Sequence, residues 1–158
     1  MTYWRMQLHP NEPGEALKYS VQSLAAGFIG LDFARSFGVR DLRETTQNTL
    51  PDHQKDYWAF AHEMNESDVV LIMAHNFPFA LATVDGDYNY IREPEPRIGV
   101  WFRHFRPVRE VRYYGDFKTN AHNWERIAMI DAISPLRDES SRSYRLIEEW
   151  LASAAATS

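Results

Sequence analysis

The stretch Asp68–Ala74, DVVLIMA, decides the fold more than any other part of the chain. This near-continuous apolar run has the length of a strand rather than of a helix, which is typical of a strand buried on both faces. A turn at His75–Pro78 and a second strand over Phe79–Tyr90 follow, with a break at Asp85–Asp87. The two segments together predict the centre of a β-sheet.

Further strands are expected on both sides of this pair. Thr2–Leu8 has strand-type side chains and is followed by His9-Pro10, and Phe28–Phe33 is a short apolar run after a glycine. Ile98–Phe105 is a later strand. Pro107 ends that strand or marks a sheet edge, because proline cannot donate to a ladder. The sequence leaves open whether Val108–Tyr113 continues the sheet.

Helices are indicated between and after the strands by apolar residues three and four apart. The expected helical ranges are Glu15–Ala26, which stops at Gly27, then Asp41–Asn48, Pro51–Asn65, His122–Ile133 and Ser143–Ala155. Mixed strands and helices predict an α+β domain with a small mixed or antiparallel sheet, curled or forming an open barrel and flanked by helices. The length of 158 residues fits one domain spanning 1–158, least defined over 110–158.

The amino-acid composition and the motifs that are missing exclude several functional classes. The absence of cysteine excludes disulfides and thiolate catalysis, and the formal net charge of −5 argues against a tight non-specific nucleic-acid binder. We find no Gly-rich phosphate loop, no nucleophile elbow and no zinc-protease motif. We therefore expect a binding domain rather than an enzyme, with no cofactor and no metal. The chain opens without a signal-like or membrane-spanning run, so we expect a cytoplasmic protein.

Four segments, read in order, carry a family resemblance. They are YWRMQL at Tyr3–Leu8, AAGFIGLDF at Ala25–Phe33, ESDVVLIMAHNFPFALATVDGDY at Glu66–Tyr88 and GVWFRHFRPV at Gly99–Val108. Together they resemble EVE-like domains of the PUA-like superfamily, which are relatives of YTH domains and of McrB-type modified-DNA-binding N-terminal domains. Ser67 stands where these domains carry glycine, and Phe33 stands where many carry tryptophan.

The resemblance implies a PUA-like fold and a reader of modified bases. Such a domain flips a methylated cytosine or adenine of DNA into an aromatic pocket and carries out no catalysis itself. In this reading the chain is a specificity module of a restriction or defence system. The nuclease or NTPase subunit would be a partner, and no membrane would be involved.

A pocket for a flipped base needs aromatic faces and polar groups for the base edge. The candidate pocket residues are Asp32, Phe33, Trp58, His75, Asn76, Phe77 and Trp101. A carboxylate at Asp32 can accept from an exocyclic amine, and Asn76 can bond a base edge. Each residue also has a structural interpretation, as a turn residue, a helix cap or part of the core. Trp4 and Trp150 are expected in the core.

Candidate phosphate-binding residues come from a loop and from one arginine-rich stretch. They are Arg35, Arg40, Arg103, Arg106 and Arg109. Arginine commonly contacts phosphate oxygens in nucleic-acid complexes. The alternative is a charged, solvated edge strand, because sheet edges often carry charge.

Three other functions stay open at this stage. The same fold could bind modified RNA. A small-molecule nucleotide sensor or an enzyme could use Asp32, His75 and His104. In the third alternative, an interaction module, the aromatic residues would only fill a core.

Overall fold

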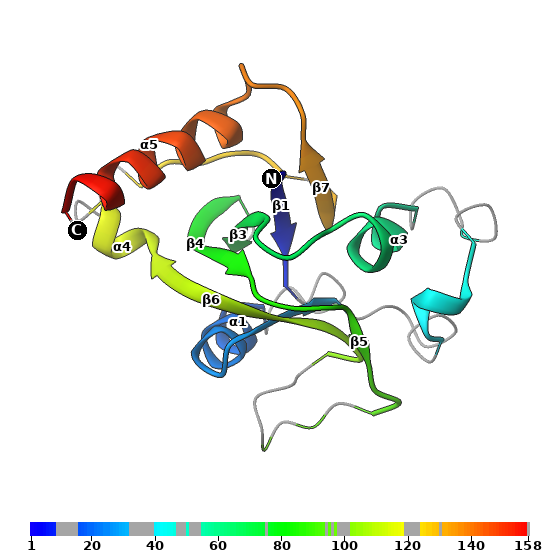
Figure 1. Cartoon of the computed structure of the whole chain (residues 1–158). Helices are drawn as coiled ribbons and strands as arrows, with labels where there is room; N and C mark the ends of the chain where they lie inside the picture. The colour runs from blue at the N-terminus through cyan, green and yellow to red at the C-terminus, as the bar shows by residue number, and fades with distance from the viewer. Residues whose placement is uncertain are drawn as a thin grey trace.

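The computed structural model describes residues 1–8, 16–31, 40–46, 50, 55–74, 76–93, 95, 97, 102–118, 124–129 and 131–157. Within these residues the chain folds as an α+β structure around one curled, mixed, seven-stranded sheet (Figure 1). The strands are β1 (Tyr3–Gln7), β2 (Phe28–Leu31), β3 (Val69–Ala74), β4 (Phe77–Val84), β5 (Asn89–Tyr90), β6 (His104–Tyr113) and β7 (Ile133–Leu136). The helical segments are α1 (Ala16–Ala25), the 3-10 turn η1 (Leu42–Glu44), α3 (Lys55–His62), α4 (Tyr114–Phe117) and α5 (Arg142–Thr157).

The strand order in the sheet is β2-β6-β4-β3-β1-β7, with β5 paired to β6 beside β4. Strands β1 and β3 are parallel and all other pairs are antiparallel. The predicted strands at the N-terminus, before Asp32 and on both sides of the His75–Pro78 turn are therefore confirmed. The break before β5 falls at the predicted Asp85–Asp87 segment.

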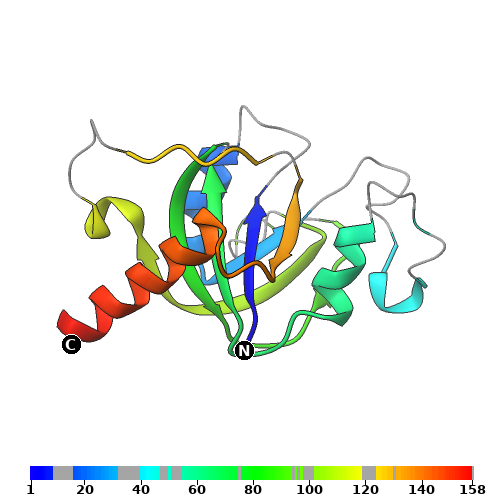
Figure 2. The same ribbon diagram turned by 90° about the horizontal axis from the view of Figure 1, so that it is seen from above.

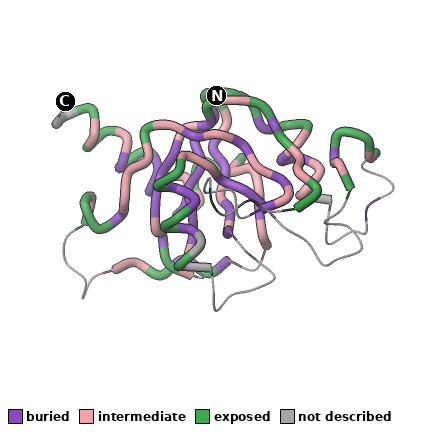
Figure 3. Tube along the Cα trace, turned by 90° about the horizontal axis from the view of Figure 1, so that it is seen from below, coloured by how far each residue is buried: buried purple, intermediate pink, exposed green. Residues whose placement is uncertain are grey.

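Alternate residues of the central strands enter two separate cores. Val70 and Ile72 of β3 belong to a cluster with Trp4 of β1, while Leu71 packs with Tyr3 in a second cluster on the other side. Residues of α1 and α3 complete the first core, and Leu146, Ile147 and Trp150 of α5 complete the second. In Figure 2, α5 lies across one side of the sheet, and Figure 3 shows the burial concentrated along the strands. Burial on both faces explains the continuous apolar run of β3.

Two positions with left-handed backbone mark the ends of elements. Gly27 has φ of 87° and follows α1, so the predicted glycine stop of this helix is confirmed. Ser67 has φ of 76°, in the turn before β3. This is the position at which the resembling domains carry glycine, the residue that takes this conformation at least cost.

The strand β6 excludes one of the two roles considered for Pro107, the end of a strand, and shows that Val108–Tyr113 continues the sheet. Of the expected strand Ile98–Phe105, residues 98–101 lie outside the described residues, and His104 and Phe105 belong to β6. Strand β6 runs without interruption from His104 to Tyr113, and pairs with β2 through its first half and with β4 through its second half. The Pro107 carbonyl accepts from the Asp85 N–H, so the proline nitrogen faces the connection between β4 and β5 rather than a strand. A bulge at Glu110, with φ of 52°, adds to the curl of the sheet.

Two predicted helices are also corrected. Residues 124–129 are not helical, and the chain then forms β7 beside β1, although Ile127 is buried as expected. The apolar spacing was misleading because this segment packs on α4 and on the β3–β4 turn through isolated contacts. The predicted polar helix after Asp41 is only the turn η1. Among the described residues, no helix has the length and apolar character needed to cross a membrane.

Candidate functional site

One end of the sheet gathers aromatic and polar side chains from four elements. Leu31, the last residue of β2, pairs with His104 on one side of β6, and Tyr90 of β5 pairs with His104 on the other side. The Tyr90 and His104 rings lie 5.3 Å apart between centroids. Gly30 makes this arrangement possible, because the Phe102 ring and the His104 carbonyl oxygen occupy the space of a Cβ atom.

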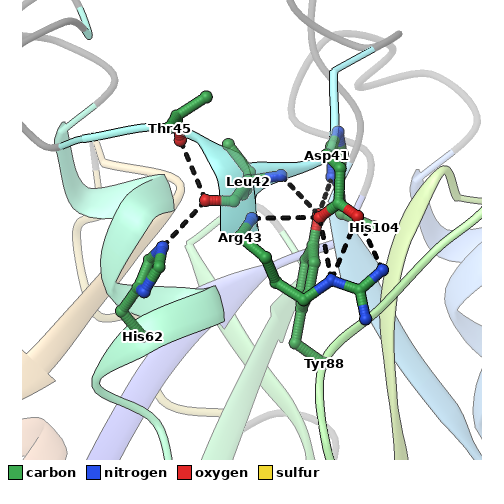
Figure 4. A network of polar contacts seen from close by, with 7 residues as sticks. All are labelled: Asp41, Leu42, Arg43, Thr45, His62, Tyr88 and His104. Atoms are coloured by element: carbon green, nitrogen blue, oxygen red, sulfur yellow. Dashed lines mark hydrogen bonds and ion pairs between the residues drawn. The ribbon is translucent and has the colours of Figure 1, made fainter.

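A buried hydrogen-bond network from Leu42 through Tyr88 to His104, which we call the relay, holds the turn η1 against this end of the sheet (Figure 4). The Tyr88 hydroxyl accepts from the Leu42 N–H at 3.0 Å and lies 2.6 Å from Nδ1 of His104. Burial raises the pKa of Tyr88, so the hydroxyl keeps its proton. Because its oxygen already accepts from Leu42, its proton is directed to Nδ1 of His104, and that ring nitrogen is the acceptor.

The helix α3 holds the same turn from its other side. Nε2 of His62 donates to the Leu42 carbonyl at 2.8 Å, and Nε1 of Trp58 donates to the Thr45 carbonyl at 3.1 Å. The Trp58 and His62 rings are stacked, with centroids 4.3 Å apart. Trp58 therefore holds the end of the turn η1 in place through Thr45. It is not among the described side chains that line the hollow described in the next paragraph.

An open hollow of about 500 Å³ adjoins this network. Its lining includes Arg40, Asp41, Glu44, Thr45 and Tyr90. The Tyr90 hydroxyl oxygen is buried, and no described residue forms a hydrogen bond with it. Such an atom needs a partner, since an unsatisfied buried polar group costs about 1–3 kcal/mol.

Asp41 is occupied by an intramolecular pair. Nε and Nη2 of Arg43 donate to its carboxylate, at distances down to 2.6 Å. The hydrogen bonds from Arg43 hold the pKa of Asp41 below its usual value. The pair therefore contributes stability above the ordinary aspartate pKa, and this contribution is lost only as the pH falls through the lowered value. The Arg43 guanidinium also lies 5.6 Å from the centroid of the Tyr88 ring.

Several residues predicted for the site lie outside the described residues: Asp32, Phe33, Arg35, His75 and Trp101. Their described chain neighbours nevertheless include Leu31, Arg40 and Phe102, which all belong to the end of the sheet that carries the hollow.

Asn76 and Phe77 lie elsewhere. Asn76 lies in the β3–β4 turn and Phe77 is the first residue of β4, at the other end of the sheet. Between the two ends β6 has 10 residues, about 30 Å of extended strand. Oδ1 of Asn76 accepts from the Met129 N–H at 3.1 Å, and the Asn76 carbonyl accepts from the Ile127 N–H. Phe77 is 43% exposed. The hollow and this turn are therefore two separate regions rather than one pocket.

The predicted phosphate-binding arginines also separate. Arg40 lines the hollow, and Arg103 precedes His104, with its Nε donating to the Arg92 carbonyl. Arg106 is buried and donates to the carbonyls of Phe60, Ala61 and Gly86, so it joins α3 to the sheet. Arg109 pairs with Asp85 at 2.9 Å. These contacts assign Arg106 a structural role and leave Arg40 and Arg103 as the candidates nearest the hollow.

Sequence reasoning missed Tyr88, Tyr90 and Glu44. The only signal for the tyrosines was their alternation, Tyr-Asn-Tyr, directly after the break at Asp85–Asp87. Glu44 gave no signal, because a lone glutamate in a polar segment is usually solvated surface. His104 of the enzyme alternative is fully buried in the relay. Among the residues that the structure describes, no three His, Asp or Glu side chains are grouped to hold a metal ion.

The fold and the site together define an α+β domain with a curled mixed sheet and, at one end, a mainly polar hollow whose lining includes Tyr90. The chain belongs to a family described as a domain of unknown function, DUF8426, whose model matches residues 4–136. This range contains the hollow and its supporting network and ends before α5. No curated protein matches the chain. The curled sheet is consistent with a PUA-like fold.

Proposed function

We propose that the chain binds a modified base, a methylated cytosine or adenine of DNA, flipped into the hollow beside Tyr90. The observation that carries this proposal is the hollow itself, which joins an aromatic ring, a buried hydroxyl that no described residue bonds, and charged groups of both signs. The hollow lies at one end of a curled mixed sheet, which is consistent with the PUA-like fold that the sequence resemblance implies.

The size and lining of the hollow suit a single unstacked base. Its volume of about 500 Å³ falls in the range of small-molecule sites. An aromatic side chain contributes roughly 1–3 kcal/mol when a base stacks on it. Tyr90 can fill this role with a ring held in place by its contact with His104. A carboxylate in the lining of the hollow can accept a hydrogen bond from the base edge.

The charge distribution supports local rather than general binding. The chain carries a net charge of −5, so its affinity for unmodified duplex should be low. Arg40 lines the hollow, and Arg103 precedes His104, the residue that pairs with Tyr90. We propose that these two arginines contact the phosphates beside a flipped nucleotide. Tight binding of the DNA phosphate backbone would need a partner protein. We propose that this partner is a nuclease or NTPase subunit of a restriction or defence system.

Binding to labelled oligonucleotides tests the proposal. We expect fluorescence anisotropy to show tighter binding of DNA that contains 5-methylcytosine or N6-methyladenine than of unmodified DNA, with affinity falling as salt rises. Tyr90→Ala should weaken binding of the preferred DNA about tenfold or more, through loss of stacking. Equal binding across modified and unmodified DNA would overturn the proposal. If the protein binds modified RNA more tightly than modified DNA, the ligand of the proposed site is RNA instead.

Phe77→Ala is the matched control. It removes an exposed aromatic ring from the opposite end of β6, where we expect no contact with the base. Binding should stay unchanged. If Phe77→Ala weakens binding as much as Tyr90→Ala does, the hollow is not the site. Thermal unfolding of both variants separates loss of binding from loss of folding.

A further inference from the structure

The two carboxylates of the hollow differ in their availability. Asp41 is engaged by Arg43 through a two-pronged pair, and its side chain is only 15% exposed. Glu44 lines the same hollow and is exposed, and no described residue bonds its carboxylate. The acceptor available to a ligand is therefore the Glu44 carboxylate, because the Tyr90 hydroxyl oxygen is buried.

The backbone of Glu44 is fixed even though its side chain is exposed. Its N–H donates to the Asp41 carbonyl at 3.1 Å, and the following Thr45 N–H donates to Leu42. Leu42 in turn is held by the Tyr88 hydroxyl and by His62. The turn that carries Glu44 is thus attached to both the sheet and α3, as Figure 4 shows for its neighbours Leu42 and Thr45. The Cα atom of Glu44 therefore has a fixed position at the rim of the hollow that its side chain lines.

We infer that Glu44 is the specificity-determining residue of the hollow and selects bases with an exocyclic amine over bases with a keto oxygen at the same position. The inference rests on the proposed function. An ionised carboxylate only accepts hydrogen bonds, so it pairs with an amine N–H and repels a keto oxygen. Hydrogen bonds to charged groups are the stronger kind.

The sharpest comparison is 5-methylcytosine against thymine. Both bases carry the same methyl group and have nearly the same size, so stacking on Tyr90 and burial of the methyl group are matched. They differ in the edge, where 5-methylcytosine has a 4-amino group and thymine a 4-keto group. A site that senses only the methyl group would bind both. A site read by Glu44 selects 5-methylcytosine and rejects its deamination product.

Competition with single-stranded oligonucleotides that carry one test base measures this selection. We expect the wild-type protein to prefer 5-methylcytosine over thymine by about tenfold or more, the scale of one charged hydrogen bond. Glu44→Gln supplies a donor as well as an acceptor, so the preference should shrink to within about twofold. Glu66→Gln, an exposed glutamate in the turn before β3, should keep it in full.

A second arm needs no variant. An oligonucleotide with N4,N4-dimethylcytosine has no amine N–H and should bind wild-type protein as poorly as one with thymine. Full retention of the preference in Glu44→Gln, or equal wild-type binding of thymine and 5-methylcytosine, overturns the role of Glu44. Either result can occur while modified DNA still binds better than unmodified DNA. Failure of every oligonucleotide to bind instead overturns the proposed function.

Discussion

The two ends of β6 use polar and aromatic residues in opposite ways. At the β3–β4 turn, both the side-chain oxygen and the carbonyl of Asn76 accept from residues 127–129, and Nε1 of Trp124 donates to the Pro78 carbonyl. These bonds attach the turn to the rest of the fold. At the other end Tyr88 joins the Leu42 N–H to Nδ1 of His104, but the Glu44 carboxylate and the Tyr90 hydroxyl have no bonding partner among the described residues.

The comparison distinguishes polar groups that hold the fold together from polar groups that are open to a ligand. A turn rich in polar and aromatic residues looks like a site in the sequence, yet Asn76 uses its hydrogen-bonding groups internally. The hollow end looks less distinctive in the sequence, but its network positions side chains whose own groups stay available. Accounting for the partners of each polar atom therefore distinguishes the two regions better than residue type does.

The largest expected difference is between two glycine substitutions, one at the hollow end and one near the other end. Gly30→Ala should lower the free energy of unfolding by about 3 kcal/mol, because the new Cβ overlaps the Phe102 ring and lies 2.5 Å from the His104 carbonyl oxygen. Gly115→Ala, in α4 near the other end, meets only Trp124 at 3.9 Å and should be neutral or stabilising by up to about 1 kcal/mol. Urea unfolding measures both. Equal effects would mean that the hollow end is not tightly packed.

The relay gives the next largest effect. Tyr88→Phe leaves the buried Leu42 N–H and Nδ1 of His104 without the shared hydroxyl, and should cost about 2 kcal/mol of stability. It should also weaken binding in the hollow, because η1 loses its attachment to the sheet. Asn76→Ala removes one hydrogen bond at the other end and should cost about 1 kcal/mol.

Binding measured on the two folded variants completes that test. Asn76→Ala should leave oligonucleotide affinity as in the wild type, and Tyr88→Phe should not. A loss of affinity confined to Asn76→Ala would reverse the assignment of the two ends.

The smallest expected effect on stability is at Ser67, which lies in neither of the two regions compared above. Ser67 adopts φ of 76° in the turn before β3, a conformation that is costly for residues with a Cβ atom. Ser67→Gly should raise the free energy of unfolding by up to about 1 kcal/mol and leave binding unchanged, despite loss of the weak 3.4 Å contact with Arg109. Thermal unfolding checks the sign, and a lower melting temperature would show that the Arg109 contact matters more than the backbone strain.

The sequence predicted the fold well wherever a strong local pattern agreed with tertiary packing. The apolar run of β3, the glycine after α1 and the last helix all follow this rule, and Trp4 and Trp150 are buried as expected. The two roles considered for Pro107 could not be distinguished from the sequence, because the cost of a proline in a strand depends on which neighbour its nitrogen faces, and that depends on the sheet topology. The segment 124–129 was misread because apolar spacing without hydrogen-bond partners does not distinguish a helix from an extended chain.

The candidate site was predictable only in part. Arg40 was predicted near the pocket and lines the hollow, and Trp58 supports it. The spatial separation of Asn76 and Phe77 from the end of β2 depends on strand order, which local patterns do not encode. The roles of Tyr88, Tyr90 and Glu44 depend on which of their polar atoms find partners, and that is a property of the folded chain.

The position of α5 bears on how this family should be handled at the bench. The family match ends at residue 136, yet Leu146, Ile147 and Trp150 of α5 fill the second core against β3. An expression boundary drawn at the end of the match would uncover a broad apolar face on the sheet. Such a truncated protein should self-associate or precipitate, so recombinant versions need the part of α5 that enters this core, through Leu151.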